Sequence, residues 1–210
     1  SFDITYLSTL PNFIIMAPSN QNELIRMINT SVSIDDRPSA FRYPRGAGEI
    51  DNTNLNYDSL EIGKGIIIKE GNDVAILNLG TRMQSCEEAI KLLNSHNIYP
   101  TLADARFAKP IDKNLIDNLL DHHKYLITIE EGSSGGFGSS VLNYIHNERR
   151  KSTLTKINNI YFPDKFIDHQ SPEDQYKEIG MDADSIANKI TKFYQDNIID
   201  FETYNKNIKN

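Results

Sequence analysis

Two arginines, Arg42 and Arg45, lie in a short stretch that could bind an anion. Residues 39–43 alternate in polarity and carry aromatic side chains, which predicts a β-strand. Pro44 cannot donate to a neighbouring strand and Gly46 frees the backbone, so the strand should end there. Arg45 is therefore expected at the carboxyl end of a strand, where ligands bind in open α/β sheets and a guanidinium group suits a phosphate or carboxylate. The alternative is a surface arginine in a turn.

Arg42 precedes Arg45 by three residues, so strand alternation places the two side chains on opposite faces. We therefore expect a structural role for Arg42, in an ion pair beneath a junction between domains. This leaves Arg45 as the residue of this stretch predicted to bind a ligand.

The glycine-rich segment 130–139 follows a predicted strand and opens a predicted helix, where backbone N–H groups could hold an anion. It does not match the dinucleotide-binding fingerprint, and it lacks the lysine of a nucleoside-triphosphate loop. The favoured interpretation is structural: the glycines allow a tight turn and close helix packing.

The five histidines do not show the spacing of metal ligands. His96, His122 and His123 are expected at helix ends, where the helix dipole favours a cation, and His146 on a polar helix face. His169 is in a predicted loop and is the one histidine that we place near a site, against the alternative of a plain surface residue. No nucleophile motif is present.

The composition, with 39% hydrophobic and 24% charged residues, is that of a soluble globular protein. The formal net charge is −7 and the basic residues are scattered, which argues against nucleic acid as a partner. No apolar run approaches the roughly 20 residues of a membrane span, so no membrane partner is expected. The single cysteine, Cys86, excludes an internal disulfide, fits a reducing compartment and is expected to be buried in a helix.

The elements that must position Arg42 and Arg45 begin with a buried strand at residues 13–17. A helix should follow, with Asn20 or Ser19 as its cap and Glu23 in the capping-box position. Its apolar side chains at helical spacing are Leu24, Met27, Ile28 and Val32. This strand, helix, strand unit is too small to cover both faces of a sheet, so residues 1–46 are interpreted as the end of a larger domain.

Residues 47–61 are polar and aperiodic, which predicts an interdomain linker. A new domain should begin at residue 62 with two strands, 65–69 and 73–79, joined by a tight turn and hence antiparallel at a sheet edge. Strands and helices then alternate with short connections, which predicts a parallel sheet covered by helices on both faces. The expected strands are 99–105, 125–129 and 157–161, and the expected helices are 81–95, one capped by Asp112, one opened by Gly136, one capped by Ser171 and 182–195. The tail 196–210 is predicted to fray.

The run 38–46 resembles a signature of 1-deoxy-D-xylulose-5-phosphate synthases, thiamine-diphosphate enzymes of the transketolase superfamily. Other segments resemble the same family in the same order: 2–7, 15–20, 62–65, 104–112 and 130–132. The similarity extends from the first residue to about Tyr194 and covers only the carboxyl-terminal portion of such a synthase. A carboxyl-terminal piece of a longer protein is therefore expected.

The resemblance implies an α/β fold over residues 62–195 like the transketolase carboxyl-terminal domain, with a mostly parallel sheet, an antiparallel edge strand and helices on both faces. It implies that residues 1–46 end a pyrimidine-binding domain and that Arg45 holds the phosphate of glyceraldehyde 3-phosphate. Phe2, Asp3 and Tyr6 would shape the wall of the active site without doing chemistry. Glu130 and Glu131 would contact the neighbouring domain or the other subunit of a homodimer.

For a complete enzyme, the resemblance implies a transferase that condenses pyruvate with D-glyceraldehyde 3-phosphate to 1-deoxy-D-xylulose 5-phosphate and CO₂, for isoprenoid and thiamine biosynthesis. Thiamine diphosphate and Mg²⁺ would be bound mainly by the remainder of the same polypeptide, so we expect this chain alone to be inactive. The family and the bias toward Asn, Lys and Ile suggest an apicoplast-like plastid, with the bacterial cytoplasm as the alternative.

Two other functions stay open. One is the β subunit of a 2-oxo acid dehydrogenase, which ends in the same two domains. The other is a non-catalytic interaction module that keeps only the fold. The pair Arg42 and Arg45 favours the synthase, because a phosphorylated acceptor needs an additional cation.

Overall fold

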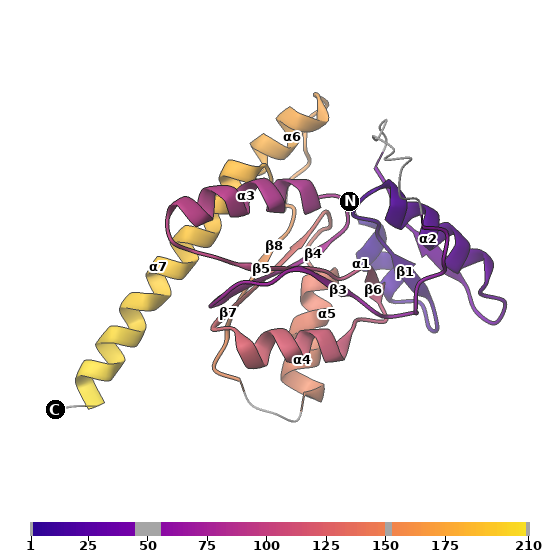
Figure 1. Cartoon of the computed structure of the whole chain (residues 1–210). Coiled ribbons are helices and arrows are strands. Elements are labelled where there is room, and N and C mark those ends of the chain that lie inside the picture. Colours follow the sequence, from indigo (N-terminus) through magenta and orange to yellow (C-terminus); the bar gives the residue numbers. More distant parts are fainter. Residues whose placement is uncertain (1, 45–55, 150–152, 209–210) are drawn as a thin grey trace.

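The structure is a computed structural model of the 210-residue chain that describes residues 2–44, 56–149 and 153–208 (Figure 1). It contains two sheets. The first has three strands in the order β2-β1-β6 and the second has five in the order β3-β5-β4-β7-β8. None of the helices in the described ranges is long and apolar enough to cross a membrane.

The small sheet combines two strands from the first segment of the chain with one strand from its middle. β1 (Ile14–Met16) pairs in parallel with β2 (Ser39–Phe41), as the predicted strand, helix, strand unit requires. Its other neighbour is β6 (Phe107–Lys109), which is antiparallel to β1 and was not predicted as a strand. β6 therefore ties the first segment of the chain to the second sheet.

Helix α2 (Gln21–Val32) packs on the small sheet and begins as predicted, because the Asn20 side chain accepts a hydrogen bond from the Glu23 N–H. Its predicted apolar face is only partly right: Met27 is buried and Leu24 half-buried, but Ile28 is 40% and Val32 77% exposed. The other buried positions are the polar Glu23 and Thr30. Thr30 can be buried because its hydroxyl donates to the Arg26 carbonyl and accepts from the Leu60 N–H.

Residues 47–55 of the predicted linker, 47–61, lie outside the described residues. The rest of the linker contacts α2. Asn29 Nδ2 donates to the Tyr57 carbonyl at 2.6 Å, and Leu60 packs against Met27 in a small apolar cluster. The predicted domain boundaries at residues 46, 62 and 195 stay predictions.

The large sheet is parallel except at one edge, which confirms the predicted fold class. Its strands are β3 (Ile66–Lys69), β4 (Val74–Leu79), β5 (Thr101–Asp104), β7 (Tyr125–Glu130) and β8 (Lys156–Ile160). The antiparallel edge strand is β3, and its partner is β5.

The predicted hairpin between β3 and β4 is wrong, because β5 inserts between these two strands. The connection after β3 crosses the start of β5, where the Asn72 N–H donates to the Tyr99 carbonyl at 2.6 Å and the Gly71 N–H donates to Thr101 Oγ1 at 2.9 Å. These hydrogen bonds join the turn to the start of β5. They do not pair β3 with β4.

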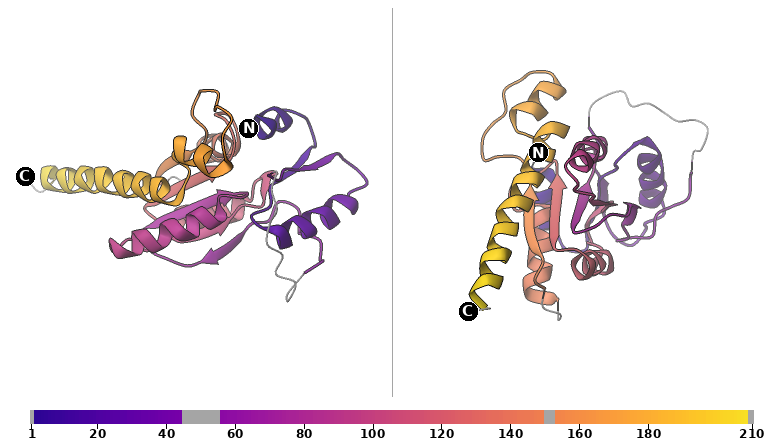
Figure 2. Two further views of the ribbon diagram at one scale, coloured as in Figure 1. Left: turned by 90° about the horizontal axis from the view of Figure 1, so that it is seen from above. Right: turned by 60° about the vertical axis from the view of Figure 1, so that its left-hand side comes forward.

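Helices cover both faces of the large sheet. Side chains of β4 alternate, so that Val74 and Ile76 face α3 (Met83–Ser95) and α7 (Ala183–Ile208), whereas Ala75 and Leu77 face the opposite layer. That layer holds α1 (Asp3–Ser8), α4 (Lys113–His122), α5 (Phe137–Asn143) and the π-helix Tyr144–Glu148. In both views of Figure 2, α7 and α2 lie on opposite sides of the molecule.

The predicted inner residues of these helices are largely confirmed: Met83, Cys86, Ile90 and Leu93 in α3, and Leu115, Ile116, Leu119 and Leu120 in α4, are buried. His96, His122 and His123 lie at the helix ends as predicted. Helix α6 (Pro172–Glu178) begins at the predicted cap, Ser171, whose hydroxyl accepts from the Asp174 N–H.

The last helix is longer than predicted. α7 ends at Ile208, so the predicted helix end at Gln195 is wrong, whereas the predicted fraying of the tail stays a prediction. No Gly or Pro occurs between Ala183 and Ile208, so no residue type in this stretch stops the helix. Figure 1 shows its second half extending beyond the body of the protein.

Candidate functional site

The site begins at the carboxyl end of β2. The strand ends at Phe41, and Arg42 follows it with its N–H donating to the Met16 carbonyl at 2.9 Å. Arg45 lies outside the described residues, so its predicted contact with a phosphate stays a prediction.

The side chain of Arg42 forms the ion pair that the sequence predicts. Its Nε lies 2.9 Å from Asp3 Oδ2 in α1, and its Nη1 lies 3.1 Å from Glu131 Oε2 beyond β7. The guanidinium group therefore joins the small sheet to the large one. Through this contact Glu131 reaches the part of the chain that carries the small sheet, whereas Glu130, which was predicted to make the same kind of contact, binds the start of α5.

Glu131 is 3% exposed and is the centre of the site. Its Oε1 accepts from Thr81 Oγ1 at 2.5 Å, from Arg82 Nε at 2.8 Å and from Tyr176 Oη at 2.7 Å. Arg82 also lies over the Tyr176 ring, 3.3 Å from its centroid, in a cation–π contact. Five segments of the chain therefore meet at one carboxylate and its partner Arg42: α1, the end of β2, the start of α3, the end of β7 and α6.

The surroundings of Glu131 and Tyr176 determine the protonation states of these two side chains. Burial acts to raise the pKa of Glu131, but the charge of Arg82 and the hydrogen bonds from Thr81 and Tyr176 outweigh it and lower that pKa. Burial, followed by the negative charge of Glu131, raises the pKa of Tyr176 to about 12. Tyr176 therefore stays a hydrogen-bond donor to a charged Glu131 at neutral pH.

The neighbouring residue Glu130 explains the glycine-rich segment. Its carboxylate, 2% exposed, accepts hydrogen bonds from the N–H groups of Phe137 and Gly138 at 2.9 and 2.8 Å. A Cβ on Gly136 would lie 2.4 Å from Glu130 Oε2, so a side chain at this position would displace the carboxylate from its N–H donors. The anion at the start of α5 is thus a side chain of the protein itself, which supports the structural interpretation of this segment.

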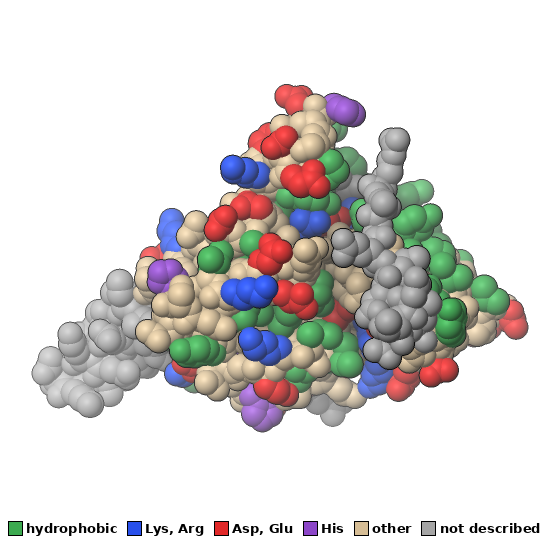
Figure 3. Space-filling view, turned by 45° about the horizontal axis from the view of Figure 1, so that its top comes forward, with side chains coloured by type: hydrophobic (Ala, Val, Ile, Leu, Met, Phe, Trp, Pro, Cys, Tyr) green, Lys and Arg blue, Asp and Glu red, His purple; other side chains and the backbone are tan. Residues whose placement is uncertain are grey.

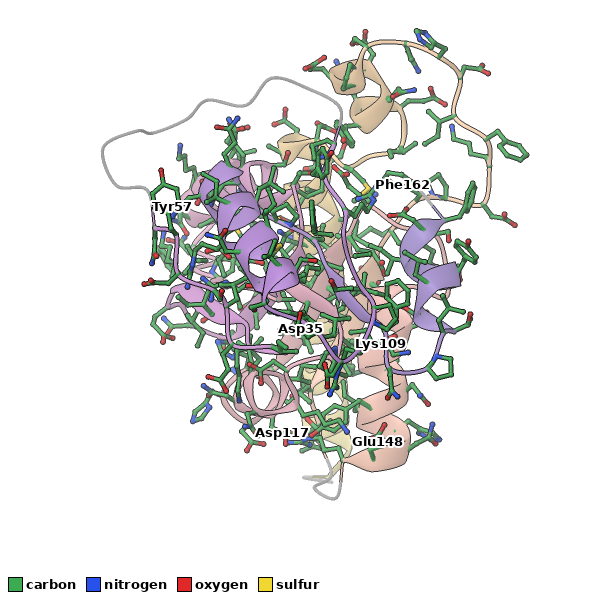
Figure 4. All side chains as sticks on the ribbon, turned by 90° about the vertical axis from the view of Figure 1, so that its right-hand side faces the viewer. Asp35, Tyr57, Lys109, Asp117, Glu148 and Phe162 are labelled. Carbon is green, nitrogen blue, oxygen red and sulfur yellow. The ribbon has the colours of Figure 1, made fainter. Side chains whose placement is uncertain are left out.

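A cleft of about 1180 Å³ opens beside Arg42 and Glu131. Phe2 and Ser133 line it on one side, and the loop that leads to α6 lines it on the other with Phe162 and His169. Figure 4 shows Phe162 at the base of that loop. His169, the histidine that the sequence places near a site, lies at this cleft. Phe2 lines it as well, whereas Asp3 and Tyr6, which were predicted to form a wall together with Phe2, are not among its lining residues.

A second polar cluster lies at the junction of the two sheets, and the sequence analysis singled it out only as part of a resemblance. Asp104 is 1% exposed at the end of β5, accepts from the Arg106 N–H at 2.9 Å and has its pKa raised by burial to about 6. Arg106 has a left-handed backbone, with φ of 58°, and pairs with Glu23 at 2.8 Å. The signal available in the sequence was an acidic and a basic residue two positions apart at a strand end.

Charges of both signs are interspersed on the face shown in Figure 3. The described residues contain no group of three or more His, Cys, Asp or Glu that could hold a metal ion. What the site does contain is a buried, fully hydrogen-bonded carboxylate that holds two arginines beside an open cleft. Such an arrangement can fix a cationic strand end next to a ligand.

Comparison with known proteins shows the family to which the chain belongs. The chain is 44% identical over 189 residues to a probable 1-deoxy-D-xylulose-5-phosphate synthase 2, chloroplastic, of Oryza sativa subsp. japonica. It is 47% identical over 190 residues to a 1-deoxy-D-xylulose-5-phosphate synthase 1, chloroplastic, of Cannabis sativa. Each alignment covers 89% of this chain and 26% of the relative, so the chain spans about a quarter of the length of these curated relatives.

Among solved structures, a split-gene transketolase described as an inactive β4 tetramer is similar, with a TM-score of 0.79 and 25% identity over 90% of this chain and 60% of that one. A family model described as the transketolase C-terminal domain matches residues 63–186. That match includes Thr81, Arg82, Glu131 and Tyr176, the residues that build the centre of the site. The chain belongs to the transketolase carboxyl-terminal domain family.

Proposed function

We propose that the chain forms the carboxyl-terminal part of a 1-deoxy-D-xylulose-5-phosphate synthase. The complete enzyme condenses pyruvate with D-glyceraldehyde 3-phosphate, releases CO₂ and supplies isoprenoid precursors. The observation that carries the proposal is the 44% and 47% identity to two such synthases across 89% of the chain. The lower identity to the split-gene transketolase, 25%, favours a synthase over a transketolase.

Within that enzyme, the proposed role of this chain is to build the side of the active site that receives the phosphorylated acceptor. Arg42 is fixed at the carboxyl end of β2, and Pro44 lines the cleft two residues later. Arg45 follows Pro44 in the sequence and is our candidate for holding the phosphate of glyceraldehyde 3-phosphate.

We assign thiamine diphosphate and Mg²⁺ mainly to the remainder of the polypeptide. Two observations support this assignment: the described residues hold no group of three or more acidic, histidine or cysteine side chains that could bind the metal ion, and the N–H groups at the start of α5 are bonded to Glu130.

The proposed assembly is a homodimer of the complete enzyme, and the chain alone is expected to be inactive. The split-gene transketolase, an inactive β4 tetramer, supports the inactivity of such a chain alone and its assembly into a homo-oligomer. The relatives are named chloroplastic, which supports a plastid location. The bias toward Asn, Lys and Ile points more narrowly to an apicoplast-like plastid rather than a bacterial cytoplasm.

A chimaera tests the proposed function. The corresponding segment of the Oryza sativa synthase is replaced by this chain, and CO₂ release and product are measured with pyruvate and glyceraldehyde 3-phosphate. We expect synthase activity from the chimaera and none from the rice protein truncated before the segment. A chimaera that is folded and binds cofactor, yet forms no product from these substrates, would count against the proposal.

A further inference from the structure

We propose that Glu131 is a positioning residue, which fixes Arg42 at the carboxyl end of β2 and thereby sets the affinity for the phosphorylated acceptor. The kinetic part of this inference rests on the proposed function. The structural part, that Glu131 holds the end of β2 in place, stands on the contacts of the chain alone.

The two oxygens of Glu131 have different partners. Oε1 is bound by Thr81, Arg82 and Tyr176, all of which belong to the unit around the large sheet. Oε2 receives Nη1 of Arg42 from the small sheet. Because the donors on Oε1 prevent the carboxylate from rotating, Oε2 is presented to Arg42 in one orientation.

Arg42 has a second carboxylate partner, Asp3, but the two ion pairs are unequal. The side chain of Glu131 is 3% exposed, whereas that of Asp3 is 35% exposed. Solvent and salt screen the pair with Asp3 more strongly than the pair with Glu131. The buried pair is therefore expected to dominate the positioning of Arg42.

The end of β2 depends on this contact because the strand is short. β2 has three residues, and after Phe41 the backbone bond from the Arg42 N–H to the Met16 carbonyl continues the pairing with β1. The side chain of Arg42 then attaches this end of the strand to the large sheet through Glu131. Loss of that attachment should loosen β2 while β4, β5 and β7 of the large sheet, paired along four to six residues, remain protected.

Amide hydrogen exchange on the 210-residue chain tests the structural part with Glu131→Gln, which keeps the side-chain shape and removes the charge. We expect exchange of the β2 and Arg42 amides to rise by about tenfold or more, since hydrogen bonds to charged groups are among the stronger ones. Amides of β4 and β7 should change little. Unchanged exchange at β2 in a folded Glu131→Gln chain would overturn the proposal.

The adjacent residue offers a matched control. Glu130 is equally buried, at 2% exposure, but it binds the N–H groups of Phe137 and Gly138. Glu130→Gln should raise exchange at the start of α5 and leave β2 unchanged. If Glu130→Gln loosens β2 as much as Glu131→Gln, the effect is a general consequence of changing a buried carboxylate, and the proposal fails.

A double-mutant cycle keeps the test valid if Glu131→Gln lowers overall stability. When Glu131 acts on β2 through Arg42, Glu131→Gln should add no further exchange at β2 in an Arg42→Met background. Additive effects would show that Glu131 acts by another route and would overturn the proposal.

In the complete synthase, Glu131→Gln should raise KM for glyceraldehyde 3-phosphate about tenfold while KM for pyruvate stays unchanged. If β2 loosens but the two KM values change together, Glu131 does not position an acceptor contact. If β2 loosens and the wild-type enzyme shows no synthase activity at all, the proposed function fails, but the structural part of the inference, that Glu131 holds the end of β2 in place, stands. The two failures are therefore distinguishable.

Discussion

Glu130 and Glu131 are adjacent buried carboxyl groups whose pKa values shift in opposite directions. Burial raises the pKa of Glu130, and the two neutral N–H donors at the start of α5 offset this only in part. Burial acts on Glu131 in the same way, but Arg82 and the hydrogen bonds from Thr81 and Tyr176 outweigh it and lower the pKa. One carboxylate thus closes the start of a helix, and the next one holds the two sheets together through Arg42.

The space around Glu130 predicts the effect of Gly136→Ala. The added Cβ would lie 2.4 Å from Glu130 Oε2, which forces the carboxylate away from the N–H groups of Phe137 and Gly138. We expect a loss of about 1–3 kcal/mol in the free energy of unfolding, measured by urea denaturation. Ser134→Ala, in the same loop, should cost much less. Equal stability of the Gly136 variant and the wild type would contradict the close approach.

The raised pKa of Asp104 predicts a pH-dependent difference between the wild type and Asp104→Asn. In the folded state burial raises this pKa from 3.8 to about 6, so between these values the folded chain keeps a proton that the unfolded chain has lost. This group therefore makes the wild type less stable as the pH rises from about 4 to about 6.

Asparagine stays neutral and can still accept from the Arg106 N–H, so the pH-dependent cost should disappear in Asp104→Asn. The stability of the variant relative to the wild type should increase by up to about 2–3 kcal/mol between pH 4 and pH 7. Urea denaturation at the two pH values measures this difference. A difference that is the same at both pH values would mean that Asp104 ionises alike in the folded and unfolded chain.

Cofactor binding is predicted to need more than this chain. Because the described residues lack a cluster for Mg²⁺ and the start of α5 is bonded to Glu130, calorimetric titration of the chain with thiamine diphosphate and Mg²⁺ should give no binding heat. The active rice chimaera serves as the positive control. Micromolar binding by the chain alone would show that the cofactor contacts have been assigned to the wrong part of the enzyme.

Arg45→Ala in the complete synthase should weaken the use of glyceraldehyde 3-phosphate much more than the use of pyruvate. A hydrogen bond to a charged group contributes about 1.5–3 kcal/mol, so kcat/KM for the acceptor should fall at least about tenfold. Arg45→Lys keeps the charge but loses the planar fork, and should restore activity only in part. Unphosphorylated glyceraldehyde is the control acceptor. Equal losses with both acceptors would remove the phosphate role from Arg45.

Short-range patterns in the sequence predicted many of the secondary-structure elements and the structural role of Arg42. Alternating and helical hydrophobic patterns predicted the buried strands and the inner faces of α3 and α4, because these patterns depend only on the geometry of each element. The caps Asn20, Asp112 and Ser171 were predictable because each cap hydrogen bond spans three residues. The same local reasoning, together with the resemblance of several short runs to one family, indicated the fold class and the structural role of Arg42.

Only the tertiary structure decided which distant segments meet. β5 lies between β3 and β4, and β6 joins the small sheet, because strand order depends on contacts between residues far apart in sequence. The buried Glu23 and Thr30 of α2 could not be recognised from hydrophobicity, since their partners Arg106 and Leu60 come from other segments. For the same reason, Glu131 was visible in the sequence as an acidic residue after a strand, whereas its bonds to Arg42, Thr81, Arg82 and Tyr176 exist only once the chain has folded.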